Sequence, residues 1–250
     1  MSEKEKGTNN SRFREIISVL RKHNITHGIS PKKLRLIMED LGPTFVKIGQ
    51  IMALHSDILP KAYCDELMEL CTDARPMPFE EAVSVIDESY GRSWKKVFSS
   101  IEETPIGSAS IAQVHRAVLK SGEEVVVKIQ RKGIYEMMAR DIDFIRKAIK
   151  LMPPISLKGM ADFDLVLDEL WSVTRDEMNF LTEASNIEEF ARRNKDVNFV
   201  QTPVLYQQYT TVHVLVMEYI DGCGIDEKDK LLEDGYDLKE IGSKLVDNYI

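Results

Sequence analysis

A short stretch of strand-type sequence interrupts a chain that otherwise shows helical patterns, and this feature restricts the fold most. Between residues 110 and 118 the content of β-branched side chains rises, and a second apolar run follows at residues 125–129. Residues 120–123 between them carry a serine and a glycine, which is typical of a turn. The two runs predict a β-hairpin in which Val126 and Lys128 point to one face and the other three residues of that run to the opposite face.

Helices are predicted before the hairpin. Over residues 11–95, prolines suited to a first helical turn precede apolar residues spaced three and four apart. Four helices are therefore expected to begin near Pro31, Pro43, Pro60 and Pro78.

The part of the chain after the hairpin alternates between helix and strand patterns. Helices are expected over 133–151, 162–193 and 238–250, and strands over 199–206 and 212–220, with a glycine joint at 221–224. This order predicts an α+β fold like the small lobe (N-lobe) of a protein kinase. It comprises a small antiparallel sheet and a long αC-like helix, with an N-terminal helical extension in front and the large lobe (C-lobe) largely absent.

The charge balance excludes one class of partner. The chain has 33 basic and 41 acidic side chains, a formal net charge of −8, so no nucleic-acid partner is expected. The polar start, residues 1–12, is expected to lack structure. The following basic residues indicate either a surface for anionic lipid or a solvated helix face. They are, with Arg12 from that start, Arg14, Arg21, Lys22, Lys32, Lys33 and Arg35.

Residues 107–114, with the sequence GSASIAQV, are similar to the loop G-x-G-x-x-G-x-V that covers the phosphates in kinases. Small residues let the backbone come close to phosphate groups, which its amides then bind. A small-residue turn between two strands is the alternative interpretation. The nucleotide-binding residues predicted here are Gly107, Ser108, Ala109, Ser110, Ala112 and Val114.

Lys128 ends an apolar strand, where its charge needs a partner. Kinases place a lysine here, in the pattern V-A-I-K, to hold the α- and β-phosphates; an edge lysine that blocks aggregation is the alternative. Glu183 on the long predicted helix is the candidate partner. Glu177 lies six residues earlier, about 120° around that helix, so it should face a different group.

Residues 214–222 resemble the fifth strand and hinge of a kinase, where adenine binds to main-chain groups. Met217 would limit the back of the adenine pocket. Glu218, Ile220 and, on the lysine strand, Val126 are further candidates for nucleotide binding. A strand that leaves the core into a turn explains the same pattern without a ligand.

Three stretches together resemble one family, the UbiB/AarF-type atypical kinases. They are residues 41–50 (LGPTFVKIGQ, with the K-x-G-Q signature), 105–117 (PIGSASIAQVHRA) and 179–186 (NFLTEASN). The resemblance covers nearly all of the chain from about residue 30.

The resemblance implies roles for single residues. Lys128 would position ATP and Glu183 would be its helix partner, while Glu177 would meet the helix that carries Lys47, Gly49 and Gln50. That helix would cover the place of a protein substrate. The family usually has E-x-D at the acidic position, whereas this chain has Glu177-Met178-Asn179, which removes one charge.

The family's catalytic-loop and metal-binding aspartates have no counterpart in these 250 residues. We therefore expect a fragment that binds ATP or ADP without appreciable phosphotransfer, with Mg²⁺ needed only by the full-length protein and no metal site here. The expected segments are a polar tail and first helix (1–28), the extension (29–100), the N-lobe and hinge (101–224) and the start of the C-lobe (225–250).

Three interpretations of function remain open. The first is the nucleotide-binding half of an atypical kinase or ATPase linked to isoprenoid-quinone biosynthesis or lipid handling. The second is a pseudokinase-like scaffold that contacts a membrane surface or quinone-biosynthesis proteins. The third is a helical interaction domain. A sparse, odd number of cysteines and the absence of a secretory signal indicate the cytoplasm, with peripheral attachment to a membrane as an alternative for the full-length protein.

Overall fold

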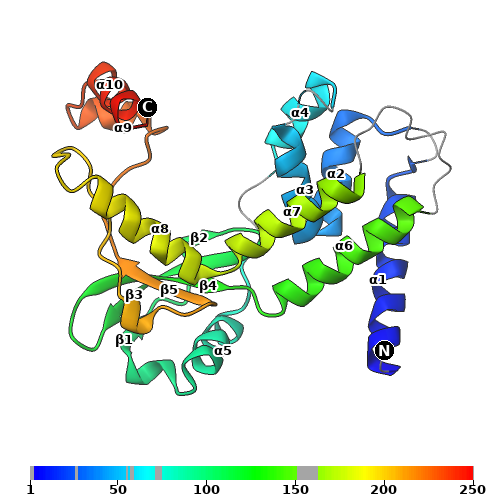
Figure 1. The fold of residues 1–250 in the computed structure, drawn as a ribbon, viewed down its shortest axis with the longest axis horizontal. Coiled ribbons are helices and arrows are strands. Elements are labelled where there is room, and N and C mark those ends of the chain that lie inside the picture. Colours follow the sequence, from blue (N-terminus) through cyan, green and yellow to red (C-terminus); the bar gives the residue numbers. More distant parts are fainter. Residues whose placement is uncertain are drawn as a thin grey trace.

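The computed structural model describes residues 3–25, 28–54, 56, 59–70, 75–150 and 163–249 (Figure 1). A five-stranded antiparallel sheet has the order β1-β3-β4-β5, with β2 paired to β3. The strands are β1 (Phe98–Ile101), β2 (Gly107–Ser108), β3 (Ala112–Leu119), β4 (Glu124–Gln130) and β5 (Val214–Glu218). The predicted hairpin is β3 and β4, paired from Val118↔Glu124 to Ala112↔Gln130. The predicted α+β class is therefore confirmed.

The strand predicted over 199–206 is wrong. In this segment Leu205 forms a single bridge to Met217, while β5 occupies the centre of the other predicted strand. Pro203 has no N–H to donate to a ladder. The chain also turns at once into a short 3₁₀ helix (Gln207–Tyr209), so regular pairing with β5 stops after one bridge.

Helices cover both faces of the sheet. Helix α5 (Phe79–Tyr90) packs against the face that carries Val125, Val127 and Ile129. Helix α8 (Phe180–Arg193) packs against the opposite face, where Phe180 and Ala184 meet Leu215. Figure 1 shows the sheet between these two helices. The predicted alternation of β4 is thus confirmed, and Lys128 lies on the α8 face. We call β1–β5 with α5 and α8 the lobe.

The single long helix predicted over 162–193 is two helices. Helix α7 (Phe163–Glu177) ends before Met178, and α8 begins at Phe180. Asn179 between them has extended backbone angles, φ −102° and ψ 97°, and its side chain accepts a hydrogen bond from the Leu181 amide. Asparagine is a favoured N-cap, so one capping residue breaks an otherwise periodic pattern.

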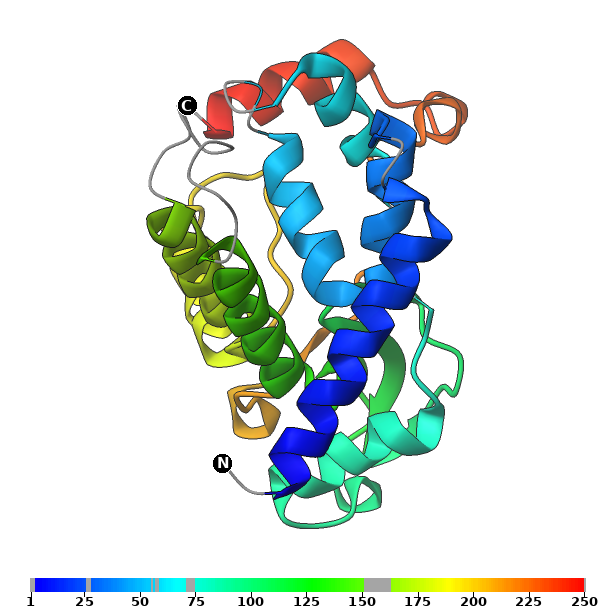
Figure 2. The ribbon, with the colours of Figure 1, turned by 90° about the vertical axis from the view of Figure 1, so that its right-hand side faces the viewer.

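The helices in front of the lobe form the extension. They are α1 (Glu3–Lys22), α2 (Pro31–Leu41), α3 (Pro43–Ala53) and α4 (Lys61–Met68). Figure 2 shows them stacked beside α6 (Ile134–Lys150) and α7. Because α1 begins at Glu3, the prediction that residues 1–12 lack structure is wrong from that residue onward. The buried side chain of Ile16 and the paired side chain of Arg12 dock the helix against the rest of the extension.

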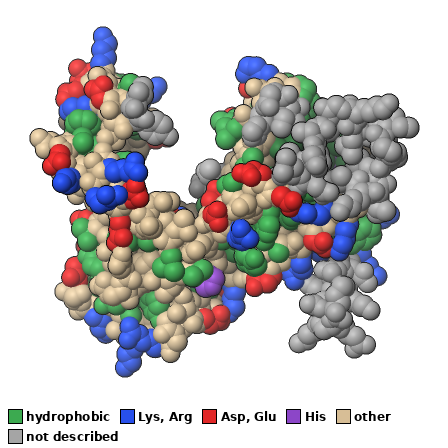
Figure 3. Space-filling view, viewed as in Figure 1, with side chains coloured by type: hydrophobic (Ala, Val, Ile, Leu, Met, Phe, Trp, Pro, Cys, Tyr) green, Lys and Arg blue, Asp and Glu red, His purple; other side chains and the backbone are tan. Residues whose placement is uncertain are grey.

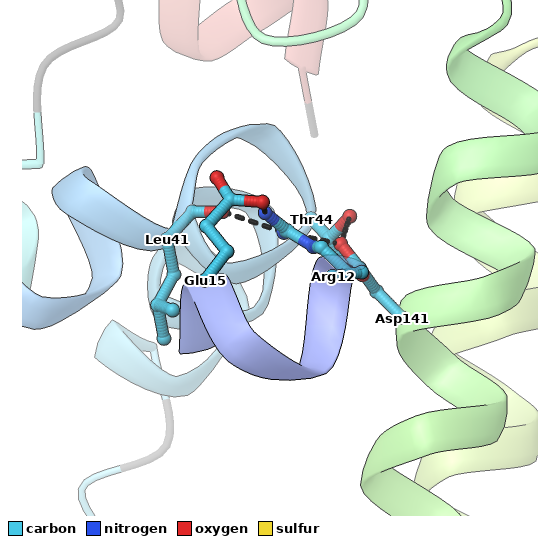
Figure 4. Close-up of polar contacts among 5 residues, drawn as sticks. All are labelled: Arg12, Glu15, Leu41, Thr44 and Asp141. Carbon is cyan, nitrogen blue, oxygen red and sulfur yellow. Dashed lines mark hydrogen bonds and ion pairs between the residues drawn. The ribbon is translucent and has the colours of Figure 1, made fainter. Parts of the chain in front are cut away.

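A buried polar cluster fastens the extension to α6 (Figure 4). The Arg12 guanidinium donates to both carboxylate oxygens of Asp141, at 2.8 and 2.7 Å. Its Nη2 also donates to the Leu41 carbonyl at 2.7 Å. The Thr44 hydroxyl donates to the same carboxylate at 2.7 Å, and Asp141 has no exposed surface. One carboxylate on α6 therefore holds α1 and the start of α3.

Several of the basic residues near the N-terminus make contacts within the protein. Besides Arg12, Lys22 forms an ion pair with Asp40 at 2.7 Å, and Arg35 pairs with Glu39 and Glu66. Neutralised in this way, these side chains contribute little to a basic face for anionic lipid. None of the described helices is both long enough and apolar enough to span a bilayer.

Two further helices, α9 (Lys228–Glu233) and α10 (Leu238–Tyr249), follow β5. Figure 1 places them at the side of the molecule opposite α1, and the predicted C-terminal helix corresponds to α10. In the space-filling view the surface is hollowed above α8, between the part that carries α9 and α10 and the extension (Figure 3).

Candidate functional site

Lys128 and Glu183 form an ion pair between the sheet and α8. Lys128 lies opposite Val114 on one neighbouring strand and Leu215 on the other. Its Nζ donates to both carboxylate oxygens of Glu183, at 2.9 and 2.7 Å, and lies 5.1 Å from the centre of the Phe180 ring. Because the lysine side chain is 25% exposed and the glutamate 35%, the pair is anchored but still open to a ligand.

Glu177 has a partner of its own, Lys47 on α3. Their Oε2 and Nζ atoms are 2.5 Å apart. Helix α3 reaches this position because Ile48 packs into an apolar cluster with Leu167 and Leu170 of α7. The two acids thus bind different cations, one on the sheet and one on the extension.

At Gly49, α3 packs tightly against neighbouring side chains. A Cβ atom at this position would lie 2.4 Å from Cδ1 of Leu70 and 2.5 Å from Sδ of Met38. Only a residue without a side chain fits at such a distance. On the same helix Gln50 is half-buried and lines the cavity described below.

The small-residue loop folds back over the end of the sheet. Gly107 pairs with Val114, and the Ala109 amide donates to the Ala112 carbonyl at 2.8 Å. Among the described residues, those with positive φ do not include any from 107–112. Alanine at the second and third glycine positions of the kinase loop therefore causes no backbone strain.

A cavity of about 460 Å³ connects these groups, and we call it the loop cavity. It is lined by residues 107–112, Val114, Lys128, Glu177, Lys47 and Gln50. A second hollow of about 460 Å³, the helix cavity, shares Lys128 and Glu177 and adds Glu183. Volumes of this size are typical of sites for small molecules and cofactors.

Other predicted residues lie outside both cavities. Val126 and Met217 pair with each other across β4 and β5, and Met217 joins the apolar cluster under α8. The Glu218 carboxylate accepts a hydrogen bond from the Val204 amide at 3.0 Å, and Ile220 is 45% exposed. Asn179 is the N-cap of α8, the helix that carries Glu183.

Gln130 and Arg131, two and three residues after Lys128, were not predicted. The Gln130 side chain donates to the Met178 carbonyl at 2.7 Å, and its Oε1 lies 2.7 Å from Nδ1 of His213. These two contacts of Gln130 hold the junction between α7 and α8, and therefore the helix ends that carry Glu177 and Glu183. Arg131 donates to the Ala109 carbonyl at 2.9 Å and thereby contacts the loop.

Gln113 and His115 fix the segment that leads from the extension into α5. Both are fully buried. Gln113 Oε1 accepts from the Met77 amide at 2.9 Å, and its Nε2 lies 2.7 Å from His115 Nε2. His115 Nδ1 lies 2.7 Å from the Glu102 carbonyl. Burial lowers the pKa of His115, so the ring is neutral and structural.

The chemistry available here is that of anion binding. An ammonium group oriented by a carboxylate, beside backbone amides in a loop of small residues, suits phosphate oxygens. Within the described residues no three acidic, histidine or cysteine side chains gather in a way that could hold a metal ion.

The chain is similar to several kinase-like proteins. An uncharacterized protein in the hydrogenase 1 5′ region of Clostridium pasteurianum is 43% identical over 220 residues, covering 88% of this chain and 42% of that protein. The chloroplastic protein ACTIVITY OF BC1 COMPLEX KINASE 8 of Arabidopsis thaliana is 37% identical, covering 93% and 30%. A "probable protein kinase UbiB" of Pseudomonas fluorescens is 35% identical, covering 86% and 40%.

Among solved structures, the complex of Rv3197 with erythromycin from Mycobacterium tuberculosis matches with a TM-score of 0.52 and 32% identity, covering 72% of this chain and 45% of that one. The chain thus spans less than half the length of these relatives. Residues 69–250 match the family model described as the ABC1 atypical kinase-like domain. Taken with the UbiB-named relatives, this match shows that the chain belongs to the ABC1 family of atypical kinases, the UbiB/AarF type.

Proposed function

We propose that the chain is the nucleotide-binding part of an ATP-dependent UbiB/AarF-type kinase or ATPase, with ATP or ADP as its ligand. The observation that carries the proposal is the Lys128–Glu183 pair, which opens on cavities bounded by the small-residue loop. The Lys128 ammonium would contact the phosphates, and Glu183 would hold it in place. Backbone amides of residues 107–112 would complete the phosphate site, with adenine toward Met217.

The extension gives the proposed site a restricted entrance. Lys47 and Gln50 line the loop cavity, and the Lys47–Glu177 pair joins α3 to α7. A polypeptide substrate would have to displace this helix, so a small or lipid-like acceptor is the better fit. The UbiB names among the relatives support a link to isoprenoid-quinone biosynthesis, with attachment at a membrane surface or to proteins of that pathway. Mg²⁺ would serve catalysis together with aspartates that these 250 residues do not contain.

A scaffold without catalysis is the second candidate, and Asn179 favours it. Where the family usually carries a second acid, this chain carries an amide that serves as a helix cap. A protein that retains the fold but binds its partners without turnover would need no charge there. The two candidates differ in whether nucleotide binding depends on Lys128.

The test is nucleotide-dependent stabilisation, measured as the shift of thermal unfolding with ATP or ADP. At 100 times its dissociation constant, a ligand raises the free energy of unfolding by about 2.7 kcal/mol. K128A should raise the dissociation constant by about tenfold or more, because a hydrogen-bonded charge pair with phosphate is lost. E183Q should weaken binding less, since it leaves the ammonium in place.

K132A is the matched control. Lys132 follows the same strand, but it pairs with Glu88 on the surface. Equal nucleotide affinity in wild type, K128A and K132A would contradict the proposed site. We also expect nucleotide binding without turnover, so appreciable Lys128-dependent ATP hydrolysis by these 250 residues would show that the expected inactivity is wrong.

A further inference from the structure

Arg131 makes an unusual set of contacts at the end of β4. Its Nε donates to the Ala109 carbonyl at 2.9 Å, and its Nη2 donates to the Ser108 hydroxyl at 2.8 Å. The same Nη2 donates to the Arg75 carbonyl at 2.9 Å, and the Arg131 backbone amide donates to the Ile111 carbonyl at 2.8 Å. Three of its partners lie in the small-residue loop and the fourth lies in the segment before α5.

The side-chain contacts of Arg131 are to neutral acceptors. Among the described residues, no acidic oxygen lies within 4.0 Å of its guanidinium. Burial lowers its pKa, and the charge of Glu81 acts in the opposite direction. Arg116 on β3 shows the contrast, because it pairs with Glu124 at 2.8 Å and stacks over the Tyr219 ring. The acceptors that hold the Arg131 guanidinium beside the loop are thus neutral, and among the described residues none of its contacts is an ion pair.

These contacts join the loop to the segment that precedes α5. Residues 107–112 line the loop cavity. The segment that contains Arg75 and Met77 leads from the extension into α5, and Met77 is fixed to β3 through the side chain of Gln113. One guanidinium thus binds the loop to the base of the extension, whose helix α3 lines the same cavity through Lys47.

We propose that Arg131 is a positioning residue that holds the loop of residues 107–112 against the segment at Arg75, sets the shape of the phosphate end of the loop cavity and favours an anionic occupant. The affinity part of this proposal rests on the proposed nucleotide binding, whereas the positioning part stands without it. A lysine could keep the charge, but its single ammonium cannot reach the planar set of acceptors that the guanidinium fork serves.

Hydrogen–deuterium exchange without nucleotide tests the positioning. R131Q should raise exchange by about tenfold in peptides that cover residues 106–113 and 75–79, because the loop loses its hydrogen bonds to a charged donor. R131K should raise it less, and R116Q should leave both peptides as in wild type. Unchanged protection in R131Q, or full protection in R131K, would overturn the assignment. If R131Q does not fold, R131K and S108A test the same assignment. S108A removes one acceptor of Arg131, so it should also raise exchange in these peptides, and unchanged protection in both variants would overturn the assignment.

Nucleotide titration of the same variants tests the effect on the ligand. R131Q should raise the dissociation constant for ATP by about tenfold, and R131K by less. A loosened loop with unchanged affinity would show that Arg131 has a structural role alone. If wild type itself binds no nucleotide, the proposed function fails, while the exchange data still decide whether Arg131 positions the loop.

Discussion

His115 is buried, and its neighbours leave it one arrangement of protons. A carbonyl oxygen can only accept, so Nδ1 must donate to Glu102. Gln113 uses its Oε1 to accept from Met77, so its amide nitrogen donates to His115 Nε2. This assignment follows from the hydrogen-bond network. A proton on Nε2 would place two donors against each other in a buried site.

Stability should therefore fall when the pH falls below the ordinary pKa of histidine. The folded pKa of His115 is lowered by burial. Between that value and about 6.5 the unfolded chain binds the extra proton and the folded chain does not, so acid favours unfolding. The loss from this residue is at most about 1.4 kcal/mol per pH unit within that window.

Urea unfolding at a series of pH values from 7 downward measures this dependence. H115Q removes the titrating group and should flatten the curve between the lowered folded pKa and about 6.5, whatever its own stability. An equal slope in H115Q and wild type would show that His115 does not titrate on unfolding.

At the scale of single elements, the sequence predicted the helices whose start and buried face are set by nearby residues. Prolines and apolar spacing marked α2 to α5 because each of these helices has its own start and its own buried face. The split between α7 and α8 was missed because a single capping residue, Asn179, interrupts an unchanged periodicity. Strands β1 and β2 are too short for alternation to appear, and they form only because β3 offers them an edge.

At the candidate site too, contacts that local sequence indicates were predicted and contacts that depend on the fold were missed. The Lys128–Glu183 pair was predicted because a lysine that ends an apolar strand needs an opposite charge and the family resemblance implies Glu183 as its partner. Gln130 and Arg131 were missed because several of their partners are backbone carbonyls, such as those of Met178 and Ala109, and a carbonyl has no residue type. Such contacts depend on the path of the chain, which a sequence pattern does not specify.

Gly49 gives the clearest prediction for an element. G49A should destabilise the protein by about 1–3 kcal/mol, because the new methyl group would have to displace Leu70 and Met38 in a packed core. Chemical unfolding measures the loss. The same substitution should push α3 away from α2 and the end of α4, and this displacement should raise hydrogen exchange in α3.

G242A is the matched control for this substitution. Gly242 lies within α10, and a Cβ atom there would meet nothing within 4 Å. Alanine favours helix over glycine, so G242A should keep or raise stability by up to about 1 kcal/mol. If G49A were as stable as G242A, the close approach of the three helices at Gly49 would be wrong.

At the scale of the whole molecule, two polar contacts join the extension to α6 and α7, the helices that lie between it and the lobe. The first is the Lys47–Glu177 ion pair, which lies at the loop cavity and remains partly exposed to solvent. The second is the buried Asp141 carboxylate on α6, which binds Arg12 and Thr44 away from the cavity. An exposed pair can exchange partners at little cost, whereas a buried carboxylate cannot. The Asp141 cluster therefore fixes the extension, and the Lys47 contact can adjust when a ligand binds.

This division leads to a prediction for the Arg12–Asp141 pair. R12A would leave a buried carboxylate with the Thr44 hydroxyl as its remaining side-chain donor, and should cost about 3 kcal/mol of unfolding free energy. K61A breaks an exposed pair with Asp65 and should have no measurable effect. Replacing both charged partners with apolar residues, in R12M/D141L, should recover part of the loss, because the unpaired buried charge is then gone.

The location of the damage distinguishes anchoring of the extension from general stability. In R12A, hydrogen exchange should rise first in α1 and around residues 41–44, while the paired strands β3 and β4 keep their protection, since their hydrogen bonds do not pass through Asp141. Nucleotide affinity should change little, because Lys128 and Glu183 lie on the sheet and α8. Uniform loss of protection, or a stability of R12A equal to that of K61A, would mean that the cluster in Figure 4 does not anchor the extension.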